Sequence, residues 1–135
     1  MINLQVLKTA LEVWGTINEK DYWESNKEKH FESHIMEVLT SSGMAVIKLP
    51  DETVEYVFPD LLVHCVLPGP TKYTFYIECK AASKRYRRSQ KASFKVFEEF
   101  VDVFPARNKK EWMDLIEMLI YKASVHHKNL TDKDP

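Results

Sequence analysis

The chain lacks most of the features that mark membrane, secreted or zinc-binding proteins. Its longest apolar run is far too short to cross a bilayer, and its N-terminus lacks the basic-then-apolar order of a signal peptide. It has two cysteines, Cys65 and Cys79, and they form no Cys-x-x-Cys pair. These absences predict no membrane association and residence in the cytoplasm or the nucleus. Both thiols are expected to pack as small buried side chains.

No low-complexity segment, internal repeat or strong charge bias is present either. The 135 residues carry 19 Lys and Arg against 20 Asp and Glu, a formal net charge of −1. Bulk charge therefore does not indicate a nucleic-acid partner. The length fits one domain with a real core. We predict a single domain over residues 1–127 and a disordered tail over residues 128–135.

Two apolar segments are separated by a strong turn signal. Residues 58–67 and 73–79 flank Pro68-Gly69-Pro70, in which both prolines fix φ and the glycine can take a positive φ. The pattern predicts a β-hairpin folded about Gly69. Because Asp60 and Glu78 are equally distant from that glycine, the hairpin would place them opposite each other, with Cβ atoms about 4.5–5.5 Å apart.

The pairing of Asp60 with Glu78 has a chemical consequence. Carboxylate oxygens are the ligands that Mg²⁺ prefers, and like charges directly opposed on a sheet are destabilising unless a cation joins them. Lys80 would share the strand face of Glu78, where its ammonium group could position an attacking water or offset charge on a phosphate. The alternative is that Asp60 only begins a strand, with Glu78 and Lys80 on the solvent face of an edge strand. The apolar residues on both sides favour the first interpretation.

A helix is predicted upstream over residues 23–42, with Gly43 as its C-cap. Glu32 lies at the edge of its apolar stripe, so the carboxylate would point at the sheet and could supply a third ligand. Glu28 and Glu37 lie farther round the helix and are expected in solvent. The stripe recurs at three- and four-residue steps and consists of Phe31, Ile35, Val38, Leu39 and Ser42.

Together these residues resemble the PD-(D/E)xK nuclease superfamily. The match consists of Glu32, Pro59-Asp60 and Glu78-Cys79-Lys80, and it covers roughly residues 31–104. The resemblance implies an α/β fold with a restriction-endonuclease-like core. That core is a small mixed β-sheet of three to five strands flanked by helices, here with extra N- and C-terminal helices. It also implies that Glu32, Asp60 and Glu78 hold Mg²⁺ or Mn²⁺, joined by the backbone carbonyl of Cys79. Lys80 would act on the water or on the scissile phosphate.

Gln90 extends the resemblance to two branches of the superfamily. In Holliday-junction-resolvase-like and VRR-type nucleases, a Gln opens the helix after the motif lysine and helps to orient the site. Viral cap-snatching endonucleases, which resemble the same superfamily, place a His on the upstream helix as a manganese ligand. His34 is two residues from Glu32, so the two side chains would point in different directions on a helix. We expect His30 and His34 in solvent.

A basic segment begins at the motif lysine. Sixteen consecutive residues, 80–95, contain no acid and include interleaved aromatic side chains. Such a segment could neutralise phosphates along a bound strand, although a solubilising loop would have the same composition. Besides Lys80, its basic residues are Lys84, Arg85, Arg87, Arg88, Lys91 and Lys95.

The remaining elements are predicted from periodicity. Helices are expected over residues 2–18 and 109–126, and strands near residues 44–49 and 54–57. A further helix from about Arg88 would end at Pro105. Its last residues, Val101 to Phe104, also alternate in polarity, so the alternative is that this segment pairs with the sheet. The helices added at both ends could form a homodimer interface.

The sequence therefore predicts a divalent-metal-dependent nuclease that hydrolyses phosphodiester bonds, with a DNA endonuclease favoured. An RNA endonuclease of the cap-snatching kind is one alternative, because no residue pattern in the sequence indicates whether a 2′-hydroxyl, the group that distinguishes RNA from DNA, is recognised. The other alternative is a catalytically silent domain on the same fold that binds nucleic acid without cutting it.

Overall fold

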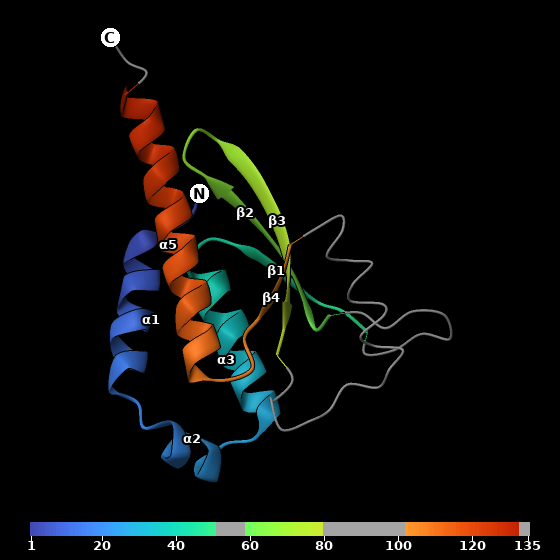
Figure 1. Ribbon diagram of the computed structural model, residues 1–135. Coiled ribbons are helices and arrows are strands. Elements are labelled where there is room, and N and C mark those ends of the chain that lie inside the picture. The colour runs from blue at the N-terminus through green and yellow to red at the C-terminus, as the bar shows by residue number, and fades with distance from the viewer. Residues whose placement is uncertain (51–58, 80–101, 133–135) are drawn as a thin grey trace.

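The computed structural model describes residues 1–50, 59–79 and 102–132. They form a four-stranded mixed sheet with helices packed beside it (Figure 1). This arrangement confirms the predicted α/β fold class, a small mixed sheet flanked by helices with additions at both ends. The strands are β1 (Ala45–Lys48), β2 (Leu61–Leu67), β3 (Thr71–Glu78) and β4 (Val103–Pro105). The helices are α1 (Leu4–Thr16), α2 (Glu19–Ser25), α3 (Glu28–Ser41) and α5 (Lys109–Asp132).

The predicted hairpin is formed by β2 and β3, and its register is the expected one. Gly69 has a φ of 118°, and the pairing runs from Leu67 opposite Thr71 to Leu61 opposite Ile77. The next position along this register is Asp60 opposite Glu78. Burial alternates along β2, in which Leu61, Val63, Cys65 and Leu67 are buried and the residues between them are half-buried. This alternation places Leu62 and His64 on one face of the sheet, as predicted, whereas Asp60 lies just before β2 and is itself buried, so the alternation does not extend to it.

The sheet has an edge strand at a place where a helix was predicted, from about Arg88 to Pro105. Val103–Pro105 forms β4, which runs parallel to β3 with Glu78 opposite Pro105. Pro105 is tolerated there because β4 is an edge strand, where a missing N–H disrupts no ladder. The predicted helix end at Pro105 is therefore wrong, and the alternative that this segment pairs with the sheet is correct. The earlier part of that helix and the strand predicted near 54–57 lie outside the described residues.

The helices agree with the predicted segments except at their ends. Asn3 caps α1, accepting hydrogen bonds from the backbone N–H groups of Gln5 and Val6 at 3.1 and 3.4 Å. The helix expected from residue 23 is two helices, because the extended backbone at Asn26 separates α2 from α3. The last helix continues to Asp132 and so includes part of the predicted tail.

The core lies between the sheet and the helical layer. Its largest fully buried side chains include Trp14 of α1, Phe31 of α3, Trp112 of α5 and Phe75 of β3. Each fully buried side chain of this kind stabilises the fold by about 1.5–3 kcal/mol. Both cysteines are buried and unbridged, as predicted.

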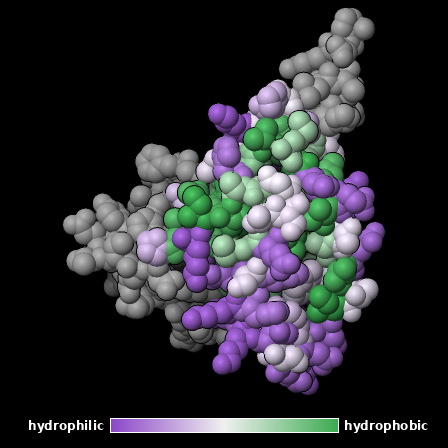
Figure 2. All heavy atoms as spheres, turned by 180° about the vertical axis from the view of Figure 1, so that it is seen from behind, coloured by the Kyte–Doolittle hydropathy of each residue, from purple (hydrophilic) through white to green (hydrophobic). Residues whose placement is uncertain are grey.

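The surface is mixed in character. On the face that Figure 2 presents, hydrophilic side chains gather in the lower half of the view and apolar ones in the upper half. Four large apolar residues of the described chain are exposed, namely Met1, Val13, Ile47 and Tyr121. None of the helices that the structure describes is both long and apolar enough to span a bilayer.

Candidate metal centre

Asp60 is fixed at the entrance to β2 by the backbones of both neighbouring strands. Its carboxylate Oδ2 accepts a hydrogen bond of 2.7 Å from the backbone N–H of Cys79. Its carbonyl accepts one of 2.9 Å from the N–H of Leu49, directly after β1. The side chain is only 7% exposed. Asp60 is therefore a buried carboxylate held at the end of the hairpin, and the contact to Cys79 ties it to the strand end that carries Glu78.

Glu78 occupies an inner position of the sheet. It is 4% exposed, and its backbone carbonyl accepts a hydrogen bond of 2.8 Å from the N–H of Ala106, just after β4. Strand β3 is bordered by β2 on one side and by β4 on the other. The interpretation of Glu78 as a solvated residue on an edge strand is therefore wrong.

Glu32 points from α3 toward the sheet, as predicted. Its side chain is 15% exposed, and its Oε1 lies 3.1 Å from Nζ of Lys48, the last residue of β1. Glu37 is exposed, in agreement with the prediction, but Glu28 is half-buried. The expectation that Glu28 lies in solvent is therefore wrong.

Burial and the charge of four acidic side chains raise the pKa of the Cys79 thiol. Burial raises the pKa of this thiol well above its ordinary value, and the negative charges of Asp60, Glu32, Glu78 and Glu28 raise the pKa further. These four acids come from α3, β3 and the residue before β2. We call these four residues the carboxylate cluster.

Glu28 is the member of the carboxylate cluster that sequence reasoning missed. It precedes Glu32 by four residues, and residues four apart lie on the same side of a helix. Once Glu32 is assigned to the sheet-facing edge of α3, this spacing is the signal that could have found Glu28.

The chemistry of the carboxylate cluster fits Mg²⁺ or Mn²⁺, because hard divalent ions take oxygen ligands. Within the described ranges, however, no group of three or more His, Cys, Asp or Glu side chains is arranged to hold a metal ion. The contacts explain this arrangement. Glu32 forms an ion pair with Lys48, and Oδ2 of Asp60 accepts a hydrogen bond from the backbone N–H of Cys79.

The other residues predicted for the site lie outside the described residues. They include the catalytic candidates Lys80 and Gln90 and the nucleic-acid-binding candidates Lys84, Arg85, Arg87, Arg88, Lys91 and Lys95. The structure thus describes only the acidic residues of the predicted site.

The upstream histidines are separate from the carboxylate cluster. His30 is exposed, as expected, but His34 is half-buried, so for this residue the expectation of solvent exposure is wrong. Nε2 of His34 accepts a hydrogen bond of 2.7 Å from the indole N–H of Trp14, which directs the ring toward α1. Burial lowers the pKa of His34. A neutral ring is also what acceptance from Trp14 requires, because a protonated ring has no acceptor.

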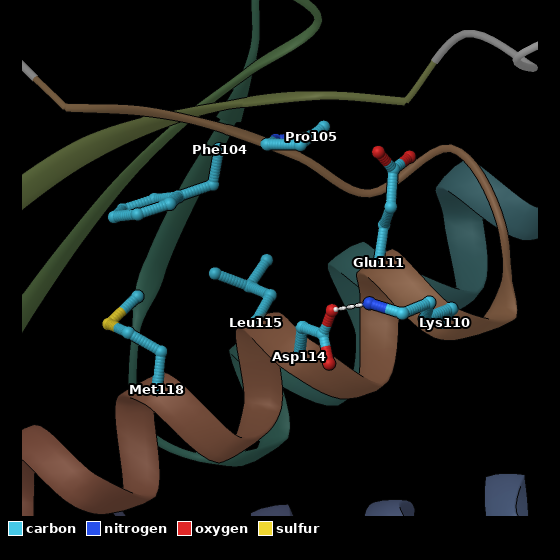
Figure 3. Close-up of a pocket in the computed structure, with 7 residues that line it drawn as sticks. All are labelled: Phe104, Pro105, Lys110, Glu111, Asp114, Leu115 and Met118. Carbon is cyan, nitrogen blue, oxygen red and sulfur yellow. Dashed lines mark hydrogen bonds and ion pairs between the residues drawn. The ribbon is translucent and has the colours of Figure 1, made fainter.

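Two cavities of the described structure lie away from the carboxylate cluster. One of about 250 Å³ lies between β4 and α5, where Phe104 faces Leu115 and Met118 and the Lys110–Asp114 ion pair lies beside Leu115 on the helix (Figure 3). The other, of about 260 Å³, is a groove between α1 and α3 that includes Trp14 and His34. Neither is lined by a member of the carboxylate cluster, so neither contributes to the candidate centre.

Comparison with known proteins adds no relative to this description. No family model, no curated protein and no solved structure matches the chain.

Proposed function

We propose that the protein is a divalent-metal-dependent nuclease that hydrolyses phosphodiester bonds, acting as an endonuclease on DNA. The observation that carries the proposal is the burial of Asp60 and Glu78 at one end of the sheet, where the register of β2 and β3 sets them opposite each other, with Glu32 of α3 paired to Lys48 at the end of the neighbouring strand β1. Burying like charges together costs free energy that a divalent cation offsets. A sequence that keeps these acids buried is best explained by a site built for such an ion.

The proposed roles follow from the type and position of each side chain. Glu32, Asp60 and Glu78 would hold Mg²⁺ or Mn²⁺, together with the carbonyl of Cys79. The metal ion, when bound, lowers the pKa of a water and offsets charge on the phosphate oxygens. Lys80, two residues after Glu78, is proposed to hold the attacking water or a phosphate oxygen.

The residues beyond the motif complete the proposal. Gln90 would orient the site, and the basic residues of segment 80–95 would contact the DNA backbone. Contacts of that kind make binding sensitive to salt and do not depend on sequence. We place the activity in the cytoplasm or the nucleus, where unbridged thiols such as those of Cys65 and Cys79 persist.

A cleavage assay tests the proposal directly. Duplex, branched and single-stranded DNA, with RNA of matched sequence, are incubated with the protein in Mg²⁺ or Mn²⁺. Asp60→Asn can still accept a hydrogen bond from the Cys79 amide but has lost the charge, so we expect the cleavage rate to fall by about 10²–10³-fold. The cleavage rate of Lys80→Ala should fall by a similar factor. Asp21→Asn, an exposed change on α2, is the matched control and should cleave like the wild type.

The same assay separates the alternatives. Wild-type rates in Asp60→Asn or Lys80→Ala would contradict the mechanism. Cleavage of RNA but not of DNA would reassign the substrate. Binding without cleavage, together with no heat of Mn²⁺ binding in a calorimetric titration, would identify a silent binding domain.

A further inference from the structure

Lys48 is a charged residue at the carboxylate cluster that the proposed mechanism does not use. Its ammonium Nζ lies 3.1 Å from Oε1 of Glu32, the proposed metal ligand on α3. The Lys48 side chain is 51% exposed, whereas that of Glu32 is only 15% exposed. The positive charge of Lys48 therefore lies against one of the carboxylates proposed as metal ligands.

The fold places Lys48 there through the reversal between α3 and β1. From Glu32 to the end of α3 the helix rises about 13 Å, and after the turn at Gly43 strand β1 returns by about 10 Å. The last residue of β1 consequently comes back beside Glu32.

The same strand brings Lys48 close to Asp60. Lys48 pairs with Leu61, the residue after Asp60, and the next backbone N–H, that of Leu49, bonds to the carbonyl of Asp60 at 2.9 Å. Opposed residues share a face of the sheet, so Lys48 lies on the helix-covered side with Leu61. The backbone thus holds Lys48 between the helix and the strand that carry two of the proposed ligands.

We propose that Lys48 is an internal counter-ion that competes with the metal ion for Glu32 and thereby sets how tightly the centre holds a divalent cation. This inference rests on the proposed function. A buried carboxylate needs a positive partner, and Lys48 supplies one to Glu32. Because the Lys48 side chain is half exposed, its ammonium group can turn into water at little cost when a cation of higher charge arrives.

The competition has a measurable size. A metal ion that takes Glu32 as a ligand must first break the pair with Lys48, and the free energy of that pair is subtracted from the binding free energy. Removing the competing charge should therefore tighten Mn²⁺ binding about fivefold, as expected for a partly exposed ion pair.

Calorimetric titration with Mn²⁺ at constant ionic strength tests the inference. Lys48→Met keeps the apolar stem and removes the charge, so its dissociation constant should fall about fivefold relative to the wild type. Lys8→Met removes the same charge from an exposed site on α1 and should leave the constant unchanged. Lys48→Arg keeps a competing cation and should bind Mn²⁺ no more tightly than the wild type.

A double variant localises the effect. In a Glu32→Gln background, Lys48→Met should no longer change the Mn²⁺ constant, because the two substitutions act on the same pair. Unchanged or weaker Mn²⁺ binding by Lys48→Met alone would overturn the inference while the wild-type titration still supports the proposed function. A wild type that binds no Mn²⁺ would overturn both, and that titration precedes all variants.

Discussion

At the scale of a single residue, Gly43 shows how one backbone conformation positions a candidate ligand. Gly43 ends α3 with a φ of 93°. Its N–H donates a hydrogen bond to the carbonyl of Thr40, and the N–H of Met44 donates one to the carbonyl of Leu39. This is the Schellman pattern, which favours glycine. A Cβ at this position would lie 2.5 Å from the carbonyl oxygen of Met1. The reversal that carries Lys48 back to Glu32 therefore depends on the absence of a side chain.

We predict that Gly43→Ala lowers the free energy of unfolding by about 2 kcal/mol, from the left-handed backbone and the contact with Met1 together. Gly15→Ala is the matched control, since a Cβ at this position in the last turn of α1 meets nothing within 4 Å. It should instead stabilise the protein by about 0.5–1 kcal/mol. Urea unfolding measures both values, and similar losses in the two variants would contradict the special role of Gly43.

The residues of the candidate centre were predictable from sequence to the extent that local geometry fixes them. The equal spacing of Asp60 and Glu78 about Gly69 was enough to place them opposite each other. Glu32 followed from helical periodicity. Lys48 did not, because its contact with Glu32 joins two elements across a turn, and no periodicity within either element records it.

At the scale of elements, the difference between prediction and structure is largest at β4. A strand of three residues is too short to show a period, and its conformation follows from pairing with Tyr76, Ile77 and Glu78 of β3. The hairpin was predicted correctly because its turn carries Pro68, Gly69 and Pro70. Elements defined by their own turns and caps can be predicted from sequence, whereas an edge strand defined by its partner cannot.

The start of α5 allows a test of pH dependence at this scale. Asn108 Oδ1 accepts a hydrogen bond of 2.9 Å from the N–H of Glu111, and the Glu111 carboxylate accepts bonds from Arg107 at its backbone N–H (3.2 Å) and Nε (2.8 Å). The side-chain hydrogen bond from Arg107 is the main cause that holds the pKa of Glu111 below 4.5. The folded state thus binds fewer protons at Glu111 than the unfolded state does.

We predict that Glu111→Gln lowers the free energy of unfolding at pH 7 by about 1 kcal/mol, the size of a solvent-screened cap interaction. A depressed folded pKa gives stability that is complete above pH 4.5 and is lost as the pH falls through the folded value. The difference in the free energy of unfolding between wild type and Glu111→Gln should therefore become smaller below pH 4.5. Asp114→Asn, whose ion pair with Lys110 is exposed, is the control and should change little. A gap of constant size down to pH 3 would contradict this prediction.

At the scale of the whole molecule, the carboxylate cluster lies where the two layers meet. Glu28 and Glu32 come from the helical layer, whereas Asp60 and Glu78 come from the sheet. A cation bound between them would join α3 to the ends of β2 and β3, in addition to offsetting the repulsion among the acids. Metal binding would then appear in the stability of the entire fold, not only in catalysis.

We therefore predict that Mn²⁺ raises the melting temperature of the wild type. A ligand at one hundred times its dissociation constant adds about 2.7 kcal/mol to stability, which for a domain of this size is a shift of about 10 °C. Asp60→Asn should lose most of this shift, while the exposed Asp21→Asn should keep it. Thermal scans with Mn²⁺ and with an excess of chelator measure the difference. Equal shifts in Asp60→Asn and the wild type would mean that the ion binds elsewhere. Because this measurement needs no substrate, it tests the metal centre independently of which nucleic acid the protein cleaves.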